Sequence, residues 1–458
     1  MPHLVSIRPP APTRQVPRPH PGAASGFVVR LLLVLSTVGV FGLWWLETPP
    51  IGSLTPGPAM TAAGELTGMV AGVLVCVQIM LIARLPWLER AIGLDRLVSW
   101  HRTLGTSVLL LTLTHVVLIV IGGKETDQVT LWSEFWTTTL PQPDVLTALI
   151  GTAVLVLAGV TSARTARRHL SYEAWYWLHT STYVAVFLTF GHQIHAGAHF
   201  VDNPVNRALW SILYLGTAAA VVVWRLALPA AGVLRYRVRV ESVVPEASGV
   251  TSVWLRGSHL EELNTRAGQF FTFRFLAWGH LATAHPYSVS ALPRDDRLRI
   301  TVGALGNHSS AVNDLRPGTP VIMQGPFGRF TSDRARGQKV LLIAGGVGIG
   351  PIRTLAHELS DQGRDVVVIH RGPSPDQLPL SHELDGRDGI RFIPVLGRRR
   401  DLGYDPLAAW SVERLVPDVS HREVFICGSP GLAATATRSL RSLGVTARHI
   451  HSEELSMS

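Results

Sequence analysis

Four histidines lie in long apolar stretches of the N-terminal half of the sequence: His101 and His115, then His179 and His192. Histidine inside a membrane-spanning segment is costly unless its ring is paired or binds a metal. The first two are 14 residues apart, which on a helix means about 21 Å along the axis and a return to within about 40° of the same face. Two such helices facing each other could ligate two haem irons, one above the other.

A single buried histidine can have a purely structural role, in which its ring hydrogen-bonds to a nearby carbonyl. Two matched pairs of histidines favour metal ligation instead. The second pair is less regular, because His179 and His192 are 13 residues apart. On an ideal helix that spacing turns the two rings about 140° away from each other. We therefore expect a kink or local unwinding at Gly191, beside His192.

Six apolar segments are long enough to cross a bilayer as helices. His101 lies at the start of one of these segments, His115 lies within it, and His179 and His192 lie in another. The first domain, residues 27–229, is therefore expected to be a six-helix transmembrane bundle that positions the histidines. The predicted spans are 27–46, 63–84, 103–123, 145–163, 173–195 and 207–228.

The segments between these spans alternate in basic content. Residues 84–102 and 164–169 are rich in arginine, whereas 47–62 and 196–206 contain neither lysine nor arginine. The positive-inside rule then predicts a multi-pass protein of the plasma (inner) membrane with both termini in the cytoplasm. Two haem pairs follow from this orientation: His101 with His179 on the inner side, and His115 with His192 on the outer side. Three cations near the inner boundary are candidate contacts for haem propionates, although ordinary interfacial charges would look the same: Arg102, Arg168 and His169.

Composition sets the remaining limits. The 458 residues are 47% hydrophobic and have a formal net charge of +9, as in a membrane protein with a soluble part. The excess charge lies near membrane ends, so we expect contact with the lipid bilayer and no nucleic-acid binding. Cys76 and Cys427 are the two cysteines, which excludes a disulfide framework and a four-cysteine iron–sulfur cluster.

The N-terminal 26 residues hold seven prolines and no acidic residue. Such a segment cannot bury enough apolar surface to fold, so residues 1–26 are predicted to be a disordered cytoplasmic tail. A signal peptide is the competing interpretation; we favour an anchor, because the tail is long and the following apolar run can span the membrane.

This first half resembles the ferric-reductase-like transmembrane domain shared by membrane ferric reductases and NADPH oxidases. The resemblance rests on six predicted spans and on His101, His115, His179 and His192 at 13- and 14-residue spacings. It implies two b-type haems held by the four histidines.

Alternating apolar residues after Pro229 predict a small antiparallel β-barrel over residues 235–333. Within it stands the run from His285 through Pro286 and Tyr287 to Ser288. A tyrosine there can stack on a flavin ring, and the serine hydroxyl can bond near the reactive flavin nitrogen. For a lone Pro-Tyr-Ser the alternative is plain packing in a strand. Further candidate donors to the flavin diphosphate are His285, Gly303, Ser309 and Ser310.

The last domain, residues 337–458, is predicted to be a doubly wound α/β domain. An unbroken apolar strand, Lys339 to Ala344, runs into a glycine-rich turn and then a helix over 352–362. Such a turn lets the backbone approach a pyrophosphate at a helix N-terminus. The turn consists of Gly345, Gly346, Gly348, Gly350 and Pro351, with the other strands expected at 365–370, 390–395 and 423–427.

Together these motifs resemble the ferredoxin–NADP reductase type of flavoprotein, over residues 235–458. The likeness implies that Tyr287 and Ser288 hold FAD, that the glycine turn holds the nicotinamide nucleotide, and that Cys427 lies beside the nicotinamide. Ser288 and Cys427 would then assist hydride transfer. Gly428 and a terminal Glu453 complete the pattern. Two departures from it are His285 in place of the arginine common in soluble members, and Leu455 in place of a terminal aromatic residue.

Arg371 directly follows a predicted strand. A guanidinium there is well placed for a 2′-phosphate, which favours NADPH over NADH as the donor.

The combined prediction is a transmembrane oxidoreductase that moves electrons from cytoplasmic NAD(P)H through FAD and two haems to an acceptor on the outer face. That acceptor is a ferric chelate, oxygen or a periplasmic protein. Two alternatives stay open: a haem-free, membrane-anchored flavin reductase, and a six-span transporter or sensor with a flavin regulatory domain. His192, His195 and His199, with Asp202, lie near the outer end and could capture a metal ion; the alternative is that one histidine ligates haem and the others are solvated loop residues. The sequence leaves the oligomeric state open.

Overall fold

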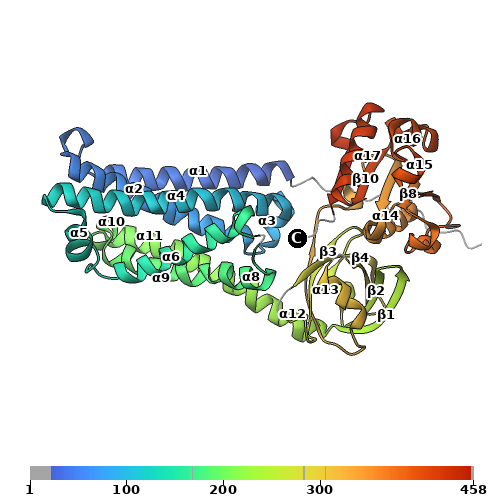
Figure 1. Ribbon diagram of the computed structural model, residues 1–458, viewed down its shortest axis with the longest axis horizontal. Helices are drawn as coiled ribbons and strands as arrows, with labels where there is room; N and C mark the ends of the chain where they lie inside the picture. Colours follow the sequence, from blue (N-terminus) through green and yellow to red (C-terminus); the bar gives the residue numbers. More distant parts are fainter. Residues whose placement is uncertain (1–21, 168, 282–283, 305, 455–458) are drawn as a thin grey trace, which may run out of the picture.

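The structure, a computed structural model, describes residues 22–454 except 168, 282–283 and 305. The predicted tail up to residue 21, Arg168 and Leu455 lie outside the described residues. Figure 1 shows two parts: an elongated bundle of helices, and a β/α part attached to one end of it. We call that end of the bundle the near end and the opposite end the far end.

The bundle contains four described helices that are long and apolar enough to cross a membrane: Pro56–Ile82, Arg96–Asp127, Val145–Ser162 and Pro204–Tyr236. They correspond to the second, third, fourth and sixth predicted spans. The first predicted span falls in α1, whose part Val34–Glu47 is apolar but shorter. The helices of the bundle are α1 (Gly22–Glu47), α2 (Pro56–Ile82), α4 (Leu94–Asp127), α6 (Val145–Ser162), α8 (Tyr172–Thr180), α9 (Thr182–His195) and α11 (Pro204–Val221).

The fifth predicted span is divided at Ser181 into α8 and α9. Three consecutive hydroxyls bond back to backbone carbonyls here: Thr180 to Tyr176, Ser181 to Leu178 and Thr182 to His179. Side chains that compete for helical carbonyls in this way bend a helix. The interruption that the histidine spacing requires is therefore present, but at Ser181 and not at Gly191, which lies inside α9.

Helices α2 and α4 pack closely because glycines line their contact. A Cβ at Gly64 would lie 3.0 Å from the Ile119 side chain, and a Cβ at Gly68 would lie 2.6 Å from Nδ1 of His115. Small residues let membrane helices approach until their backbones nearly touch. The ring of His115 thus fills space that any larger residue at position 68 would occupy.

The first unit of the β/α part is a six-stranded antiparallel sheet with the strand order β1-β2-β5-β4-β3-β6. It curls until its outer strands meet at a bridge between Arg239 and Pro320. Phe271, Phe273 and Phe275 alternate inward from β3 and are fully buried in its core. Its strands are β1 (Arg239–Ala247), β2 (Val250–Arg256), β3 (Phe270–Phe275), β4 (His285–Arg294), β5 (Arg297–Gly303) and β6 (Val321–Phe327).

The second unit is a five-stranded parallel sheet with the order β11-β10-β7-β8-β9. Separate apolar cores cover its two faces, which explains why its strands lack polar alternation. Helix α14 (Ile349–Asp361) packs on one face, and α16 (Ala409–Leu415) and α17 (Pro430–Ser442) belong to the other core. Its strands are β7 (Lys339–Gly345), β8 (Asp365–Gly372), β9 (Ile390–Leu396), β10 (Glu423–Gly428) and β11 (Ile450–Glu454).

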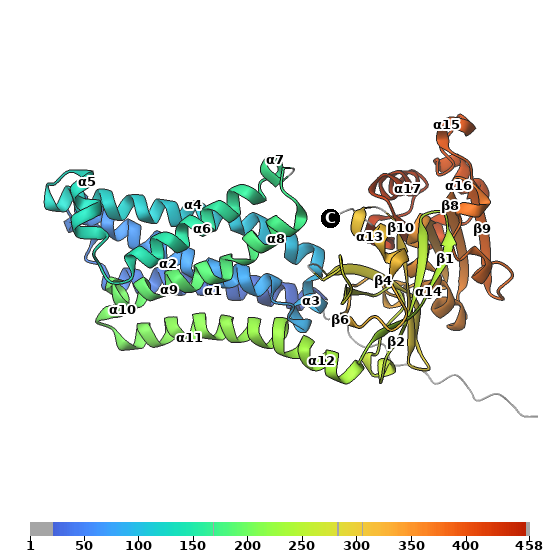
Figure 2. The ribbon, with the colours of Figure 1, turned by 60° about the horizontal axis from the view of Figure 1, so that its bottom comes forward.

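The bundle meets the β/α part at its near end, where α12 (Leu228–Tyr236) leads into β1 and the short α3 (Pro86–Ile92) lies beside β6 (Figure 2). The Arg84 guanidinium lies 4.8 Å from the ring centroid of Phe327, the last residue of β6. The arginine-rich 84–102 segment is therefore at the same end of the bundle as the β/α part.

Candidate functional site

The four histidines form two facing pairs inside the bundle. The ring centroids of His101 and His179 are 5.9 Å apart, with their planes at 78°. Those of His115 and His192 are 6.4 Å apart, with their planes at 40°. Helix α4 supplies one member of each pair, and α8 and α9 supply the other. The structure therefore brings together the same histidines that the predicted arrangement of the spans paired.

Hydrogen bonds determine which ring nitrogen carries the proton in the α4 histidines. Nδ1 of His101 donates to the Gln78 carbonyl at 3.0 Å, and Nδ1 of His115 donates to the Gly64 carbonyl at 2.8 Å. A carbonyl only accepts, so Nδ1 carries the proton in both rings and Nε2 keeps its lone pair. Histidines that bind metals commonly have this arrangement.

His179 is held by side chains and not by a carbonyl. Its Nδ1 lies 3.3 Å from the Ser162 hydroxyl, and its ring stacks on Trp175 at 5.0 Å between centroids. Sequence reasoning missed Gln78, Gly64 and Ser162, because each of their contacts joins different helices. It also missed Trp175, although this residue precedes His179 by one helical turn in α8, a spacing that the sequence shows.

The predicted propionate contacts and outer histidines have different surroundings. Arg102 and His169 are exposed. His195 donates from Nδ1 to Asp144 at 2.5 Å. His199 is 7% exposed and lies between two carboxylates, with Nδ1 3.1 Å from Glu47 and Nε2 3.2 Å from Glu65. Within the described residues, no three histidine, cysteine or acidic side chains converge as a metal site.

The two carboxylates around His199 have an electrostatic consequence. Both ring nitrogens face carboxylate oxygens, an arrangement that favours the doubly protonated imidazolium. The hydrogen bond to Glu65, opposed by partial burial and aided by Glu47, raises the pKa of His199. This cluster ties α1, α2 and the short α10 (Ala198–Val201) together at the far end of the bundle.

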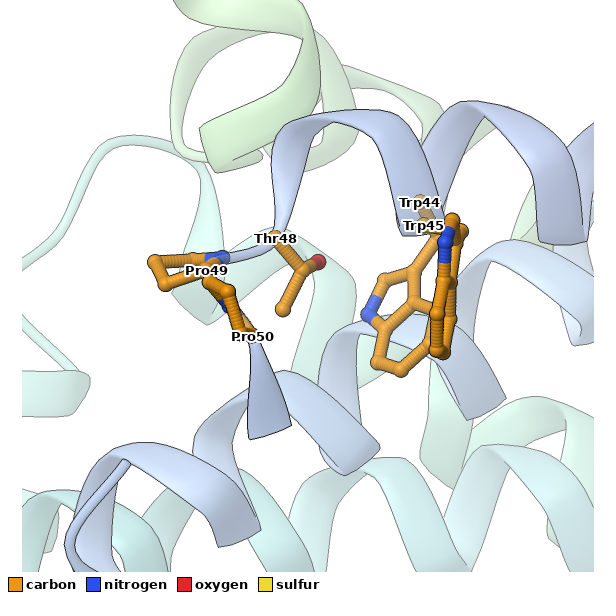
Figure 3. A pocket seen from close by; sticks show the side chains of 5 residues that line it. All are labelled: Trp44, Trp45, Thr48, Pro49 and Pro50. Atoms are coloured by element: carbon orange, nitrogen blue, oxygen red, sulfur yellow. The ribbon is translucent and has the colours of Figure 1, made fainter. Parts of the chain in front are cut away.

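A shallow hollow of about 120 Å³ lies next to this cluster, at the end of α1. Figure 3 shows Trp44 and Trp45 on one side of it and Thr48, Pro49 and Pro50 on the other. It contains none of the residues predicted to bind a cofactor.

In the antiparallel unit the run from His285 to Ser288 opens strand β4. Tyr287 is half-buried, with its ring 6.2 Å from that of Phe273 and 6.4 Å from that of His285. Burial raises the pKa of the Tyr287 phenol, so it stays neutral. Gly303 ends β5, and Ser309 and Ser310 lie in the short α13 (Asn307–Ser310), where the Gly306 backbone N–H donates to the Ser309 hydroxyl at 3.0 Å.

The predicted nucleotide residues gather at the carboxyl ends of the parallel strands. Gly345 ends β7, and Gly346 and Gly348 form the turn into α14, where Gly350 and Pro351 lie in the first turn. Gly348 packs against the carbonyl of Cys427, so a side chain there would clash with the end of β10. A Cβ at Gly303 would lie 2.8 Å from Val347, so the two units meet at this turn.

Cys427 and Gly428 end β10, and Cys427 is paired in register with Glu453 of β11. Complete burial, with a smaller contribution from the Glu453 charge, raises the pKa of the Cys427 thiol. A thiol in this state is not a nucleophile.

Arg371 has close partners in the structure. Its Nη1 donates to the carbonyls of Gly372 at 2.6 Å and Val395 at 3.1 Å, and its Nη2 donates to the carbonyl of Gly397. The guanidinium therefore braces the carboxyl ends of β8 and β9.

An ionic network that sequence reasoning did not find joins the two units. Arg299 of β5 donates to both carboxylate oxygens of Glu383, at 2.6 and 3.2 Å, and Arg353 of α14 lies 2.6 Å from the same carboxylate. Burial alone would raise the pKa of Glu383, but the hydrogen bond and charge of Arg299 and the charge of Arg353 lower it.

Comparison with known proteins agrees with this division. A family described as "Ferric reductase like transmembrane component" matches residues 67–190, which include His101, His115 and His179 and end two residues before His192. The glycine betaine monooxygenase reductase subunit of Chromohalobacter salexigens is 26% identical over 235 residues, covering 48% of this chain and 64% of that protein. The flavohemoprotein of Bacillus subtilis is 26% identical over 224 residues, covering 45% of this chain and 56% of that protein.

Among solved structures, a ferredoxin NADP+ reductase from Neisseria gonorrhoeae covers 47% of this chain and 97% of its own, with 19% identity and a TM-score of 0.42. The chain spans less than two thirds of the curated relatives named above. The chain therefore joins a ferric-reductase-like transmembrane domain to an FAD/NAD-binding domain of the ferredoxin reductase type.

Proposed function

We propose that the chain is a transmembrane oxidoreductase that moves electrons from NAD(P)H, through FAD and two b-type haems, to an acceptor on the outer face of the membrane. The observation that carries the proposal is the pair of facing histidines at each of two depths in the bundle. The family match over residues 67–190 and the reductase relatives support the same conclusion.

The residues present fit a haem iron between each pair. Imidazole nitrogens bind first-row metals at about 2.0 Å, so two rings on opposite sides of one ion have centroids about 6 Å apart. The observed separations are 5.9 and 6.4 Å. Nδ1 is protonated in His101 and His115, which leaves Nε2 free to ligate. Haem would supply one-electron chemistry that side chains alone lack.

In the reductase part, Tyr287 and Ser288 would hold the flavin ring. His285, Gly303, Ser309 and Ser310 would contact its diphosphate. The turn from Gly345 to Pro351 would hold the nucleotide phosphates at the N-terminus of α14. Cys427 would shape the nicotinamide pocket with Gly428 and Glu453. FAD would convert a two-electron hydride donor into single electrons.

We propose further that the reductase part is cytoplasmic in the plasma (inner) membrane. The support is that the arginine-rich 84–102 segment lies at the near end, beside β6, and basic segments favour the cytoplasmic side. His101 and His179 are then the inner pair, and His115 and His192 the outer pair.

NADPH stays our favoured donor. Arg371 would have to exchange carbonyl contacts for a 2′-phosphate, so Arg371→Ala should raise the KM for NADPH more than the KM for NADH. Equal changes in the two KM values would assign Arg371 to bracing the strands alone.

The decisive experiment is a reduced-minus-oxidised difference spectrum of the purified protein and its single variants. We expect b-type bands from two haems, with His101→Ala losing one and His115→Ala losing the other. His195→Ala is the matched control, because His195 pairs with Asp144 and should leave both haems intact. Absence of haem from the wild-type protein, with flavin retained, would leave a membrane-anchored flavin reductase.

The acceptor is a ferric chelate, oxygen or a periplasmic protein. Bis-histidine ligation leaves no open iron position, so each would be reduced at a haem edge. NAD(P)H consumption with a ferric chelate or with oxygen, measured with and without superoxide dismutase, separates the first two. Activity only after adding a periplasmic extract would indicate the third.

A further inference from the structure

His179 differs from the α4 histidines in what accepts its Nδ1 proton. His101 and His115 donate to backbone carbonyls, which no side-chain substitution can remove. The acceptor for His179 is the hydroxyl of Ser162, at 3.3 Å. Ser162 is the last residue of α6, and His179 lies near the end of α8. This contact therefore joins α6 and α8 through the Oγ atom of Ser162, which a side-chain substitution can remove.

The distances around Ser162 favour one arrangement of protons, because the Ala158 carbonyl at 2.6 Å is a much shorter contact than His179 Nδ1 at 3.3 Å. A serine hydroxyl has one proton to donate and two lone pairs. Its proton goes to the Ala158 carbonyl at 2.6 Å, and one lone pair accepts from Nε1 of Trp175 at 3.0 Å. The remaining lone pair can only accept from His179. Nδ1 of His179 is therefore the protonated nitrogen, and Nε2 has the lone pair.

Trp175 restrains the same imidazole in a second way. Its indole stacks on the His179 ring, with centroids 5.0 Å apart and planes at 17°. Arg167 lies in the segment that connects α6 to α8, and its guanidinium is 4.9 Å from the centroid of the Trp175 indole. Ser162 thus selects the tautomer of His179, and Trp175 fixes the plane of its ring.

We propose that Ser162, supported by Trp175, is a positioning residue that sets the reduction potential of the haem held by His101 and His179. The inference rests on the proposed function. A ligating imidazole that donates from its second nitrogen is more basic, and a more basic ligand favours the ferric over the ferrous state. The Ser162 hydroxyl therefore lowers the potential of this haem and leaves the His115–His192 haem unaffected.

The test is spectroelectrochemical titration of the purified full-length protein. Ser162→Ala should raise the midpoint potential of one haem by up to about 59 mV, a tenfold change in a one-electron equilibrium. Ser162→Thr keeps the hydroxyl and should restore the wild-type value. Thr161→Val is the matched control, since the Thr161 hydroxyl donates to the Leu157 and Ala158 carbonyls and not to a histidine.

Electron paramagnetic resonance identifies which haem responds. The ligand planes are at 78° in the His101–His179 pair and at 40° in the other pair, so the two ferric low-spin signals should differ. Ser162→Ala should change only the signal that His101→Ala abolishes. Wild-type potentials in Ser162→Ala, or a shift of the other haem, would overturn the inference while leaving the proposed function intact.

Trp175→Phe provides a second variant if Ser162→Ala does not accumulate. It keeps an aromatic ring against His179 but leaves His179 as the only donor to the Ser162 lone pairs. The potential of the same haem should then fall. A rise would contradict the assigned proton arrangement, and a wild-type protein with no haem would instead refute the proposed function.

Discussion

The guanidinium of Arg329, just beyond β6, donates from Nη1 to the carbonyl of Ile92 at 3.3 Å, and to that of Ala91 at the same distance. These carbonyls end α3 and have no partner within that helix. A cation at this position also complements the negative end of the helix dipole. One side chain of the reductase part thus caps a helix of the membrane bundle.

Arg329→Ala should slow haem reduction by NAD(P)H about tenfold, because a charge-assisted hydrogen bond contributes about 1.5 kcal/mol or more to holding the two parts in register. Reduction of a soluble dye, which takes electrons directly from flavin, should stay at the wild-type rate. Stopped-flow absorbance measures both. Arg294→Ala, at an exposed turn between β4 and β5, is the control. Parallel losses of dye and haem reduction would mean that Arg329 supports the flavin site and not the docking.

Gly68→Ala should remove the haem that we propose His115 and His192 hold, while sparing the other proposed haem. The added Cβ would lie 2.6 Å from Nδ1 of His115, so the ring or helix α2 must shift. The haem-to-protein ratio and the difference spectrum report the loss. Gly216→Ala on α11 is the matched control, since a Cβ there meets nothing within 4 Å. Full haem content in Gly68→Ala would show that α2 can shift to accommodate the methyl group without displacing the His115 ring.

Acid should weaken the contact between the two reductase units. The pKa of Glu383 is lowered in the folded protein, so its stabilising effect is present above the ordinary carboxyl pKa and is lost as the pH falls through the lowered value. Glu383→Gln should lower the free energy of unfolding at neutral pH by about 3 kcal/mol, because two arginines lose their shared partner.

Calorimetry of the Glu383→Gln protein between about pH 6 and about pH 3, the range in which the wild-type carboxylate would take up its proton, should also show a flatter acid dependence than the wild type. Glu262→Gln is the control, since its ion pair with Arg235 is exposed. Wild-type stability at neutral pH together with a wild-type acid slope would rule out this role for the network.

The stability of the far end of the bundle should decrease as the pH rises, whereas that of the Glu383 network should decrease as the pH falls. The pKa of His199 is raised by Glu65 and Glu47, so its contribution is complete below its ordinary pKa and is lost as the pH rises through the raised value. The melting temperature in detergent should therefore fall between about pH 6 and about pH 9. His199→Gln should remove that slope and His195→Gln should keep it; a slope unchanged in both variants would assign it to other groups.

Much of the site could be read from local pattern. The residue types and the 14-residue interval predicted that His101 and His115 lie at two heights on one face of a helix, because a continuous helix converts sequence spacing directly into height and direction. The unbroken apolar strand before Gly345 predicted a parallel sheet buried on both faces, because such a strand has no solvent-facing side that needs polar residues. The glycines that follow it predicted a phosphate-binding turn. These inferences need no knowledge of what lies across the fold.

The remaining features depend on which segments meet. The Gly64 carbonyl accepts a hydrogen bond from His115, which is 51 residues away in the sequence. Arg299 donates to Glu383, which is 84 residues away. The break at Ser181 brings His192 around to face α4, which the 13-residue interval forbids on an ideal helix. The sequence by itself determined which imidazoles are candidate haem ligands, because residue type and helical spacing are local properties. Tertiary structure decided their tautomers, ring planes and neighbours, because hydrogen bonds and packing form between helices that the sequence keeps far apart.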